Sequence, residues 1–174
     1  MSPAVGSSGG SLTRSQVEDW HTSHLTDAAT NWRQAATGSE TTFDEHRRNI
    51  ALPGGTTWAG NAKDAALDRA TADCAVVGRQ SGLLREAASL ADSGSYDIKT
   101  ARDKAVEAIT AAEDDGFSVG EDLTITDTKR VDASSSRARQ TSANEHAEDI
   151  RWTVEQLVST AELVGKRLQG KAVE

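Results

Sequence analysis

Residues 52–60 read Leu-Pro-Gly-Gly-Thr-Thr-Trp-Ala-Gly and separate two long stretches of helix-forming sequence. Proline restricts the backbone of the residue before it, and glycines supply positive φ, so the preceding helix is expected to end here. Thr56 or Thr57 can cap the helix that follows. A tight connection between two long helices predicts an antiparallel αα-hairpin with Trp58 at its turn.

The helix before this turn is expected to begin near Thr13. Residues 13–16, Thr-Arg-Ser-Gln, have the form of a capping box, in which each end's side chain satisfies a backbone N–H of the other. Residues suited to a buried face then recur at a step near 3.67, which predicts one unbroken helix up to the turn. They are Val17, Trp20, His24, Ala28, Trp32, Ala35, Phe43, His46 and Ile50.

After the turn, an alanine-rich helix is expected to end near Asp92-Ser93-Gly94. Ser95 is then expected to cap a third, shorter helix that ends at Gly116, a glycine suited to a left-handed cap. Residues 117–128 alternate and are β-branched, so they could form a small hairpin or an extended strap. A lone hairpin is marginal, which favours a strap with Phe117 and Ile125 buried and Ser118 and Glu121 in water.

The last helix is expected to start between Thr128 and Ser136 and to end near Gly170. Its second half alternates apolar residues by four and three, which is typical of an a/d seam. We interpret this seam as intramolecular core, with a partner helix or self-association as the alternative. The seam residues are Ile150, Val154, Leu157, Ala161, Val164 and Leu168.

Together these elements predict an all-α fold, an elongated up-down-up-down helical bundle. Residues 13–170 would form one domain, with a helical hairpin at 13–92 and the third helix, strap and last helix at 95–170. Residues 1–12 read as a flexible tail. The 174-residue length, the aromatic content of 4% and the presence of only two prolines fit an alanine-rich bundle.

Charge and composition argue against several partners. The net charge of −8 argues against nucleic acid and anionic membrane surfaces. No apolar run reaches the roughly 18 residues of a membrane span, and the first residues do not read as a general secretory signal. Cys74 reads as a small buried hydrophobe, since a nucleophile would need a neighbouring histidine in an electropositive site.

Trp58-Ala59-Gly60 resembles the Trp-x-Gly motif of type VII secretion substrates, which are helical hairpins carrying this tripeptide between their two helices. The resemblance covers roughly residues 12–100. More loosely, the whole chain is similar to larger mycobacterial secretion-associated proteins that place such a hairpin ahead of further helices. The resemblance implies that Trp58 and Gly60 are the motif residues. It also implies that the binding partner is a helical protein, a chaperone or the secretion machinery, and that the chain reaches the cell envelope or the medium by a non-classical route.

The family's secretion signal has the form Tyr-x-x-x-Asp/Glu, shortly after the second helix. Tyr96 has the expected position, but its fourth follower is Thr100, so the signal is degenerate. Either a partner chain carries the signal, or the chain is a non-secreted relative. The second reading gives the alternative function, a cytoplasmic helical scaffold or adaptor.

The sequence predicts no catalysis, no cofactor and no metal site. His21 and His24 with Asp27 have a spacing that a metal could use, yet two histidines and one acid fall short of a structural site. Nothing resembles a catalytic triad or a phosphate-binding loop. The hypothesis at this point is a type VII secretion-associated protein that acts through helical protein–protein interaction, with a homo-oligomer as an alternative to a separate partner.

Overall fold

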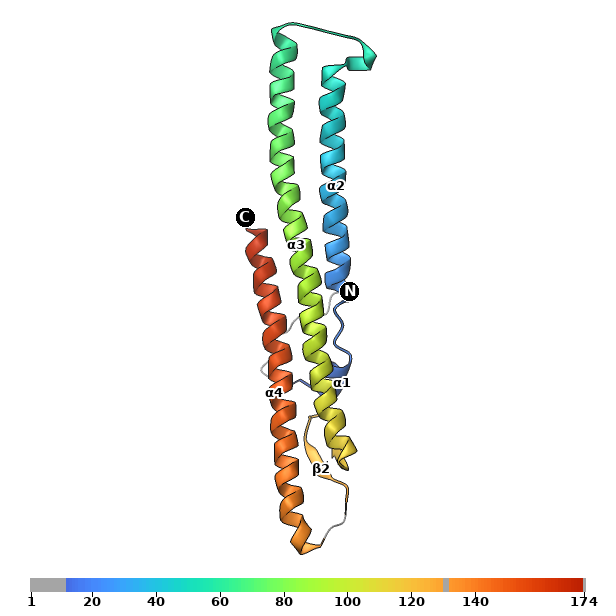
Figure 1. Ribbon diagram of the computed structural model, residues 1–174, viewed down its shortest axis with the longest axis vertical. Coiled ribbons are helices and arrows are strands. Elements are labelled where there is room, and N and C mark those ends of the chain that lie inside the picture. Colours follow the sequence, from blue (N-terminus) through green and yellow to red (C-terminus); the bar gives the residue numbers. More distant parts are fainter. Residues whose placement is uncertain (1–11, 130–131, 174) are drawn as a thin grey trace. The chain divides into compact units, whose positions relative to one another are not determined.

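The computed structural model describes residues 12–129 and 132–173. These residues are mostly helical, with one small two-stranded sheet, which confirms the all-α class (Figure 1). The expected tail at 1–12 lies outside the described residues except for Leu12. The elements are α1 (Arg14–Glu18), α2 (Ser23–Ala51), the 3-10 turn η1 (Pro53–Gly55), α3 (Asn61–Asp114), β1 (Phe117–Val119), β2 (Ile125–Asp127) and α4 (Ala133–Ala172).

The chain divides into two compact units. Unit 1 combines the described residues up to His21 with Asp97–Glu162, and unit 2 combines Thr22–Tyr96 with Leu163–Glu174. Unit 1 therefore holds α1, both strands and the greater part of α4. Unit 2 holds α2, η1 and the first two thirds of α3.

In unit 2, α2 and α3 lie side by side and antiparallel (Figure 1). Hydrogen bonds and an ion pair join residues whose numbers run in opposite directions along the two helices: Phe43 with Cys74, Ala36 with Ser81 and Arg33 with Asp92. The buried residues between them are small, chiefly alanines. Small side chains let the two backbones approach closely, as the alanine-rich sequence predicts.

The expected break at Asp92-Ser93-Gly94 is wrong, because α3 continues through it to Asp114. Gly94 is buried against α4, where a Cβ would lie 2.5 Å from Val164 Cγ1. Ser95 is also buried, and its hydroxyl donates to Thr22 Oγ1 at 2.8 Å. Here glycine permits a close helix contact and serine bonds to a neighbouring element. The two residues therefore do not act as a stop and a cap, and the separate third helix does not exist.

The expected unbroken first helix is also wrong, since α1 ends at Glu18 and α2 starts at Ser23. The capping box of Thr13 and Gln16 is confirmed. The carbonyl of Glu18, which a continuing helix would give to the amide of residue 22, instead accepts from the Arg102 guanidinium at 3.2 Å. The break shifts the buried face of α2 by one residue, to Leu25, Ala29 and Ala36.

Residues 117–127 form an antiparallel hairpin, so the preferred strap is wrong. Phe117 pairs with Asp127 and Val119 with Ile125. Phe117 and Val119 are buried, which supplies the packing that an isolated ribbon lacks. Ser118 and Glu121 are exposed as expected, whereas Ile125 is only half-buried.

The core of unit 1 contains large apolar side chains. Val17, Ile109, Ile150 and Leu157 are all below 2% exposed. Gly116 ends α3 with φ +84, which confirms its expected role as the left-handed cap. Ile150, Val154 and Leu157 in unit 1 and Val164 in unit 2 are buried, which supports intramolecular core as the reading of the seam.

Candidate interaction surfaces

The connection between α2 and α3 carries Trp58, which is half-buried. Its indole Nε1 donates to the Ile50 carbonyl at 2.7 Å, a carbonyl in the last turn of α2 that has no partner within the helix. Gly60 has φ +115, a value that other residues rarely adopt, and its carbonyl accepts from Lys63 N at the start of α3. The tryptophan and the glycine thus hold the end of one helix and the start of the next.

Tyr96 lies within α3 and not after it, so the expected position of the signal, shortly after a second helix, is wrong. Its side chain is 71% exposed. Between Asn61 and Tyr96 the helix rises roughly 52 Å at 1.5 Å per residue. Trp58 and Tyr96 therefore belong to two separate surfaces of unit 2.

In unit 1 the hairpin is anchored to α4 through Phe117. The Arg139 guanidinium lies 3.8 Å above the Phe117 ring centroid, and the His146 ring meets the same ring edge-on at 5.5 Å. Arg139 also donates to both carboxylate oxygens of Asp127, at 2.6 and 2.9 Å. These hydrogen bonds, with one from the Lys129 amide, lower the pKa of Asp127 to about 2. His146 Nε2 contacts the Asp115 carboxylate at 2.7 Å.

The other side of the hairpin holds α1. The Ser15 amide donates to the Glu121 carboxylate at 3.0 Å, which together with hydroxyl contacts lowers the pKa of that carboxyl. The Arg14 guanidinium binds Glu113, Glu18 and the Val119 carbonyl, and the carboxylates of Glu113 and Glu18 raise the pKa of Arg14. The hairpin loop is thereby fixed between α1 and α4.

This fixed loop forms one wall of a groove in unit 1, with a volume of about 980 Å³. The wall consists of Leu12 and residues 122–125, and the opposite wall is the face of α4 from Gln140 to Glu162. Leu123 and Ile125 are half-buried, and Ile150 and Val154 lie buried at the base. Apolar residues thus line part of the groove, beside polar and charged side chains of the loop and of α4.

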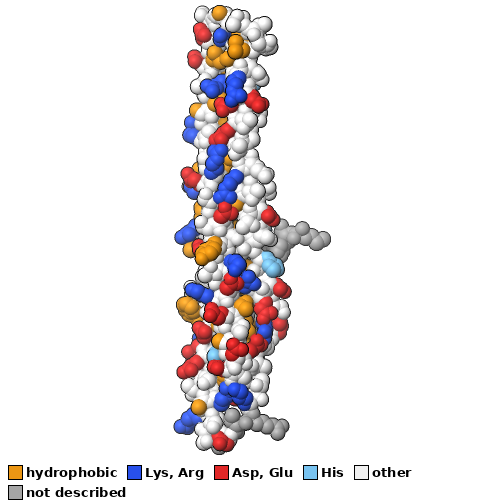
Figure 2. Space-filling view, turned by 45° about the vertical axis from the view of Figure 1, so that its right-hand side comes forward, with side chains coloured by type: hydrophobic (Ala, Val, Ile, Leu, Met, Phe, Trp, Pro, Cys, Tyr) orange, Lys and Arg blue, Asp and Glu red, His pale blue; other side chains and the backbone are white. Residues whose placement is uncertain are grey.

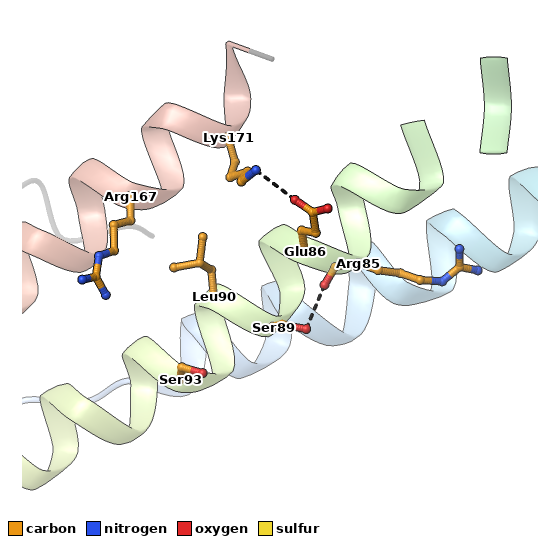
Figure 3. A pocket seen from close by; sticks show the side chains of 7 residues that line it. All are labelled: Arg85, Glu86, Ser89, Leu90, Ser93, Arg167 and Lys171. Carbon is orange, nitrogen blue, oxygen red and sulfur yellow. Dashed lines mark hydrogen bonds and ion pairs between the residues drawn. The ribbon is translucent and has the colours of Figure 1, made fainter. Parts of the chain in front are cut away.

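A second groove, of about 570 Å³, lies in unit 2 between α3 and the end of α4 (Figure 3). Arg167 and Leu90 point into it from opposite helices (Figure 3). Lys171 crosses it to bind Glu86 at 2.9 Å, while Arg85 turns toward α2 and binds Glu40. Its charges are therefore mostly paired within the chain.

Lys and Arg side chains are interspersed with Asp and Glu on the face that Figure 2 displays. Within residues 12–129 and 132–173, no group of three or more His, Cys, Asp or Glu side chains is placed to hold a metal ion. His21 precedes α2 and His24 lies inside it, so the two do not share a helical face. Among the same residues, no helix is both long and apolar enough to cross a bilayer.

Sequence reasoning missed the groove and the contacts of Arg139 and His146 with Phe117. The groove depends on a loop conformation in which Leu123 has φ +62, and no residue pattern indicates a leucine in that region. The only signal was Gly120-Glu121-Asp122, a sequence typical of turns, in which Asp122 accepts from the Thr124 amide and hydroxyl. The contact of Arg139 with Phe117 joins residues from separate elements, so their spacing in the sequence does not predict it.

Relatives of the chain occur in mycobacteria. The chain is 37% identical over 157 residues to the uncharacterized protein Rv2077c of Mycobacterium tuberculosis (strain ATCC 25618 / H37Rv), and equally to the uncharacterized protein Mb2102c of Mycobacterium bovis. The match covers 90% of this chain and 48% of each relative, so the chain spans about half the length of the curated relatives it matches. No family model matches the chain. No solved structure matches it either.

Proposed function

We propose that the chain is a type VII secretion-associated protein, an all-helical protein that binds helical partner proteins and performs no catalysis. The observation that carries the proposal is the Trp58-Ala59-Gly60 connection between two long helices. Trp58 closes the end of α2, and Gly60 takes a positive φ directly before α3. This geometry gives both motif residues a physical role, and the mycobacterial origin of the relatives fits the resemblance.

Export can be tested with the tagged chain expressed in a mycobacterium. We expect it in the culture filtrate or cell envelope of the parent strain and only inside cells when the type VII secretion ATPase is deleted. Trp58→Ala should reduce export, and Trp58→Phe should retain more of it. Trp152→Ala is the matched control, because Trp152 is 57% exposed on α4. Export that is equal in the ATPase-deleted strain would refute the proposal.

The second candidate function is a cytoplasmic helical scaffold or adaptor. It is favoured by Tyr96, which lacks an acid at its fourth follower and lies inside a continuous helix. Under this alternative the chain stays in the cell in both strains. Co-expression with a helical partner that carries an intact signal separates the two functions, since such a partner would restore export only of a secretion-associated chain.

A further inference from the structure

We propose that the groove of unit 1 binds a basic amphipathic helix of another protein. This proposal rests on the proposed function in helical protein–protein interaction and specifies the partner's chemistry. The groove lies along one face of α4, where lining residues follow at steps of three or four; Ile150 and Val154 are buried there, and Ala147 and Val158 remain accessible. Its lining from Gln140 to Glu162 is roughly 33 Å long at 1.5 Å per residue. A helix of about six turns matches that length, and apolar grooves of this kind accept helices through residues at the same spacing.

The charge of the rim selects the partner. Asp122, Glu155 and Glu162 line the groove against a single cation, Arg151. Hydrogen bonds from Thr124 lower the pKa of Asp122, so its carboxylate stays ionised at neutral pH. Carboxylates beside an apolar floor favour a helix whose apolar stripe is flanked by Lys or Arg.

The same rim disfavours other occupants. A second copy of the chain would bring identical carboxylates together across the contact, and like charges facing one another oppose association. Nucleic acid and anionic membrane need a basic face, which this rim does not offer.

The groove wall also contains backbone strain. Leu123 has φ +62, in the left-handed region where glycine and asparagine are common and bulky residues are outliers. A glycine or asparagine there would relieve the strain but remove an apolar side chain from the groove wall. Strained residues cluster where binding requires them, which is how we interpret this leucine.

The test uses the full chain and two synthetic 22-residue helical peptides with the same leucine stripe, one flanked by lysines and one by glutamates. By calorimetry near physiological salt, the lysine peptide should bind, and the glutamate peptide should bind at least about tenfold more weakly. The double substitution Glu155→Gln with Glu162→Gln should lower the affinity for the lysine peptide on the order of tenfold, since each rim charge contributes modestly to binding.

The matched control is Glu145→Gln with Glu148→Gln, which removes the same charge from exposed positions of α4 outside the groove lining. This pair should change affinity less than about twofold. Leu123→Asn keeps a residue that tolerates positive φ and should weaken binding several-fold through lost apolar contact, with an unchanged circular dichroism spectrum.

Three outcomes overturn the proposal: no binding of the lysine peptide, equal effects of the two glutamine pairs, or a dimer in ultracentrifugation that Leu123→Asn dissociates. Equal effects would mean general attraction to an acidic chain, and such a dimer would make a second copy the occupant. None of these results bears on ATPase-dependent export. Conversely, a chain that is not exported could still bind the lysine peptide, so the two proposals fail separately.

Discussion

The two units bury different kinds of side chain. Of the five largest side chains that are fully buried, Val17, Ile109, Ile150 and Leu157 belong to unit 1, and the one in unit 2 is Ser81. Both units leave some large apolar groups in water, Trp152 at 57% exposure in unit 1 and Phe43 at 36%, Val76 at 42% and Leu52 at 52% in unit 2. One unit has an apolar core, and the other is a close pairing of small residues.

This difference determines what stabilises each unit. Unit 1 gains from apolar area removed from water, at about 25 cal/mol per Å². Both units also contain ion pairs near the surface, such as Arg33–Asp92 at 2.7 Å in unit 2, in which both side chains are more than 40% exposed. Exposed ion pairs contribute roughly 0–1 kcal/mol each. Unit 2 therefore depends less on apolar burial than unit 1 does.

The largest expected effect comes from removing a leucine from each unit. Leu157→Ala in unit 1 should lower the free energy of unfolding by about 2–5 kcal/mol, because it leaves a cavity in a fully buried site. Leu67→Ala in unit 2 is the matched change at a half-buried site and should cost roughly 1 kcal/mol. Urea denaturation measures both, and equal losses would contradict the contrast between the units.

The sequence predicted helix content, the turn at residues 52–60, the Thr13 capping box and the seam of α4, because each depends on local spacing or on a proline. It failed where tertiary contacts override local preference. Gly94 and Ser95 have the residue types of a stop and a cap, but α4 packs against the first and Thr22 binds the second. The strap was preferred over the hairpin for the same reason, since the packing that supports the hairpin comes from Phe117 against Arg139 and His146 of α4.

A smaller effect separates two glycines of α3 in unit 2. Gly94→Ala should cost about 1–3 kcal/mol, because the new Cβ would lie 2.5 Å from Val164 Cγ1 in a packed contact. Gly78→Ala meets nothing within 4 Å and should stabilise the helix by about 0.5–1 kcal/mol. Opposite shifts in melting temperature are expected. If both variants stabilise the chain, α4 does not approach α3 closely at residue 94.

The smallest effect concerns the acid dependence of unit 1. The pKa of Asp127 falls from 3.8 to about 2 in the folded chain, chiefly through hydrogen bonds from Arg139. A carboxyl with a lowered folded pKa contributes stability that is complete above the unfolded value and is lost as pH falls through the folded value. The wild type should therefore be more stable than Asp127→Asn at pH 7, and this difference should close between pH 3.8 and about 2.

Asp103→Asn is the matched control. Its carboxyl pKa is also lowered, chiefly by Lys99, but through an ion pair within one turn of α3 that does not involve the hairpin. The readout is hydrogen-exchange protection of the Gly120 amide, which donates to the Thr124 carbonyl at 2.9 Å across the hairpin. Three results together would show that Arg139 holds the hairpin through Asp127. Protection should decrease in the wild type as the pH is lowered, it should already be reduced in Asp127→Asn at pH 7, and at pH 7 it should be the same in Asp103→Asn as in the wild type. Equal protection in all three proteins would mean that burial of Phe117 alone holds the groove wall in place.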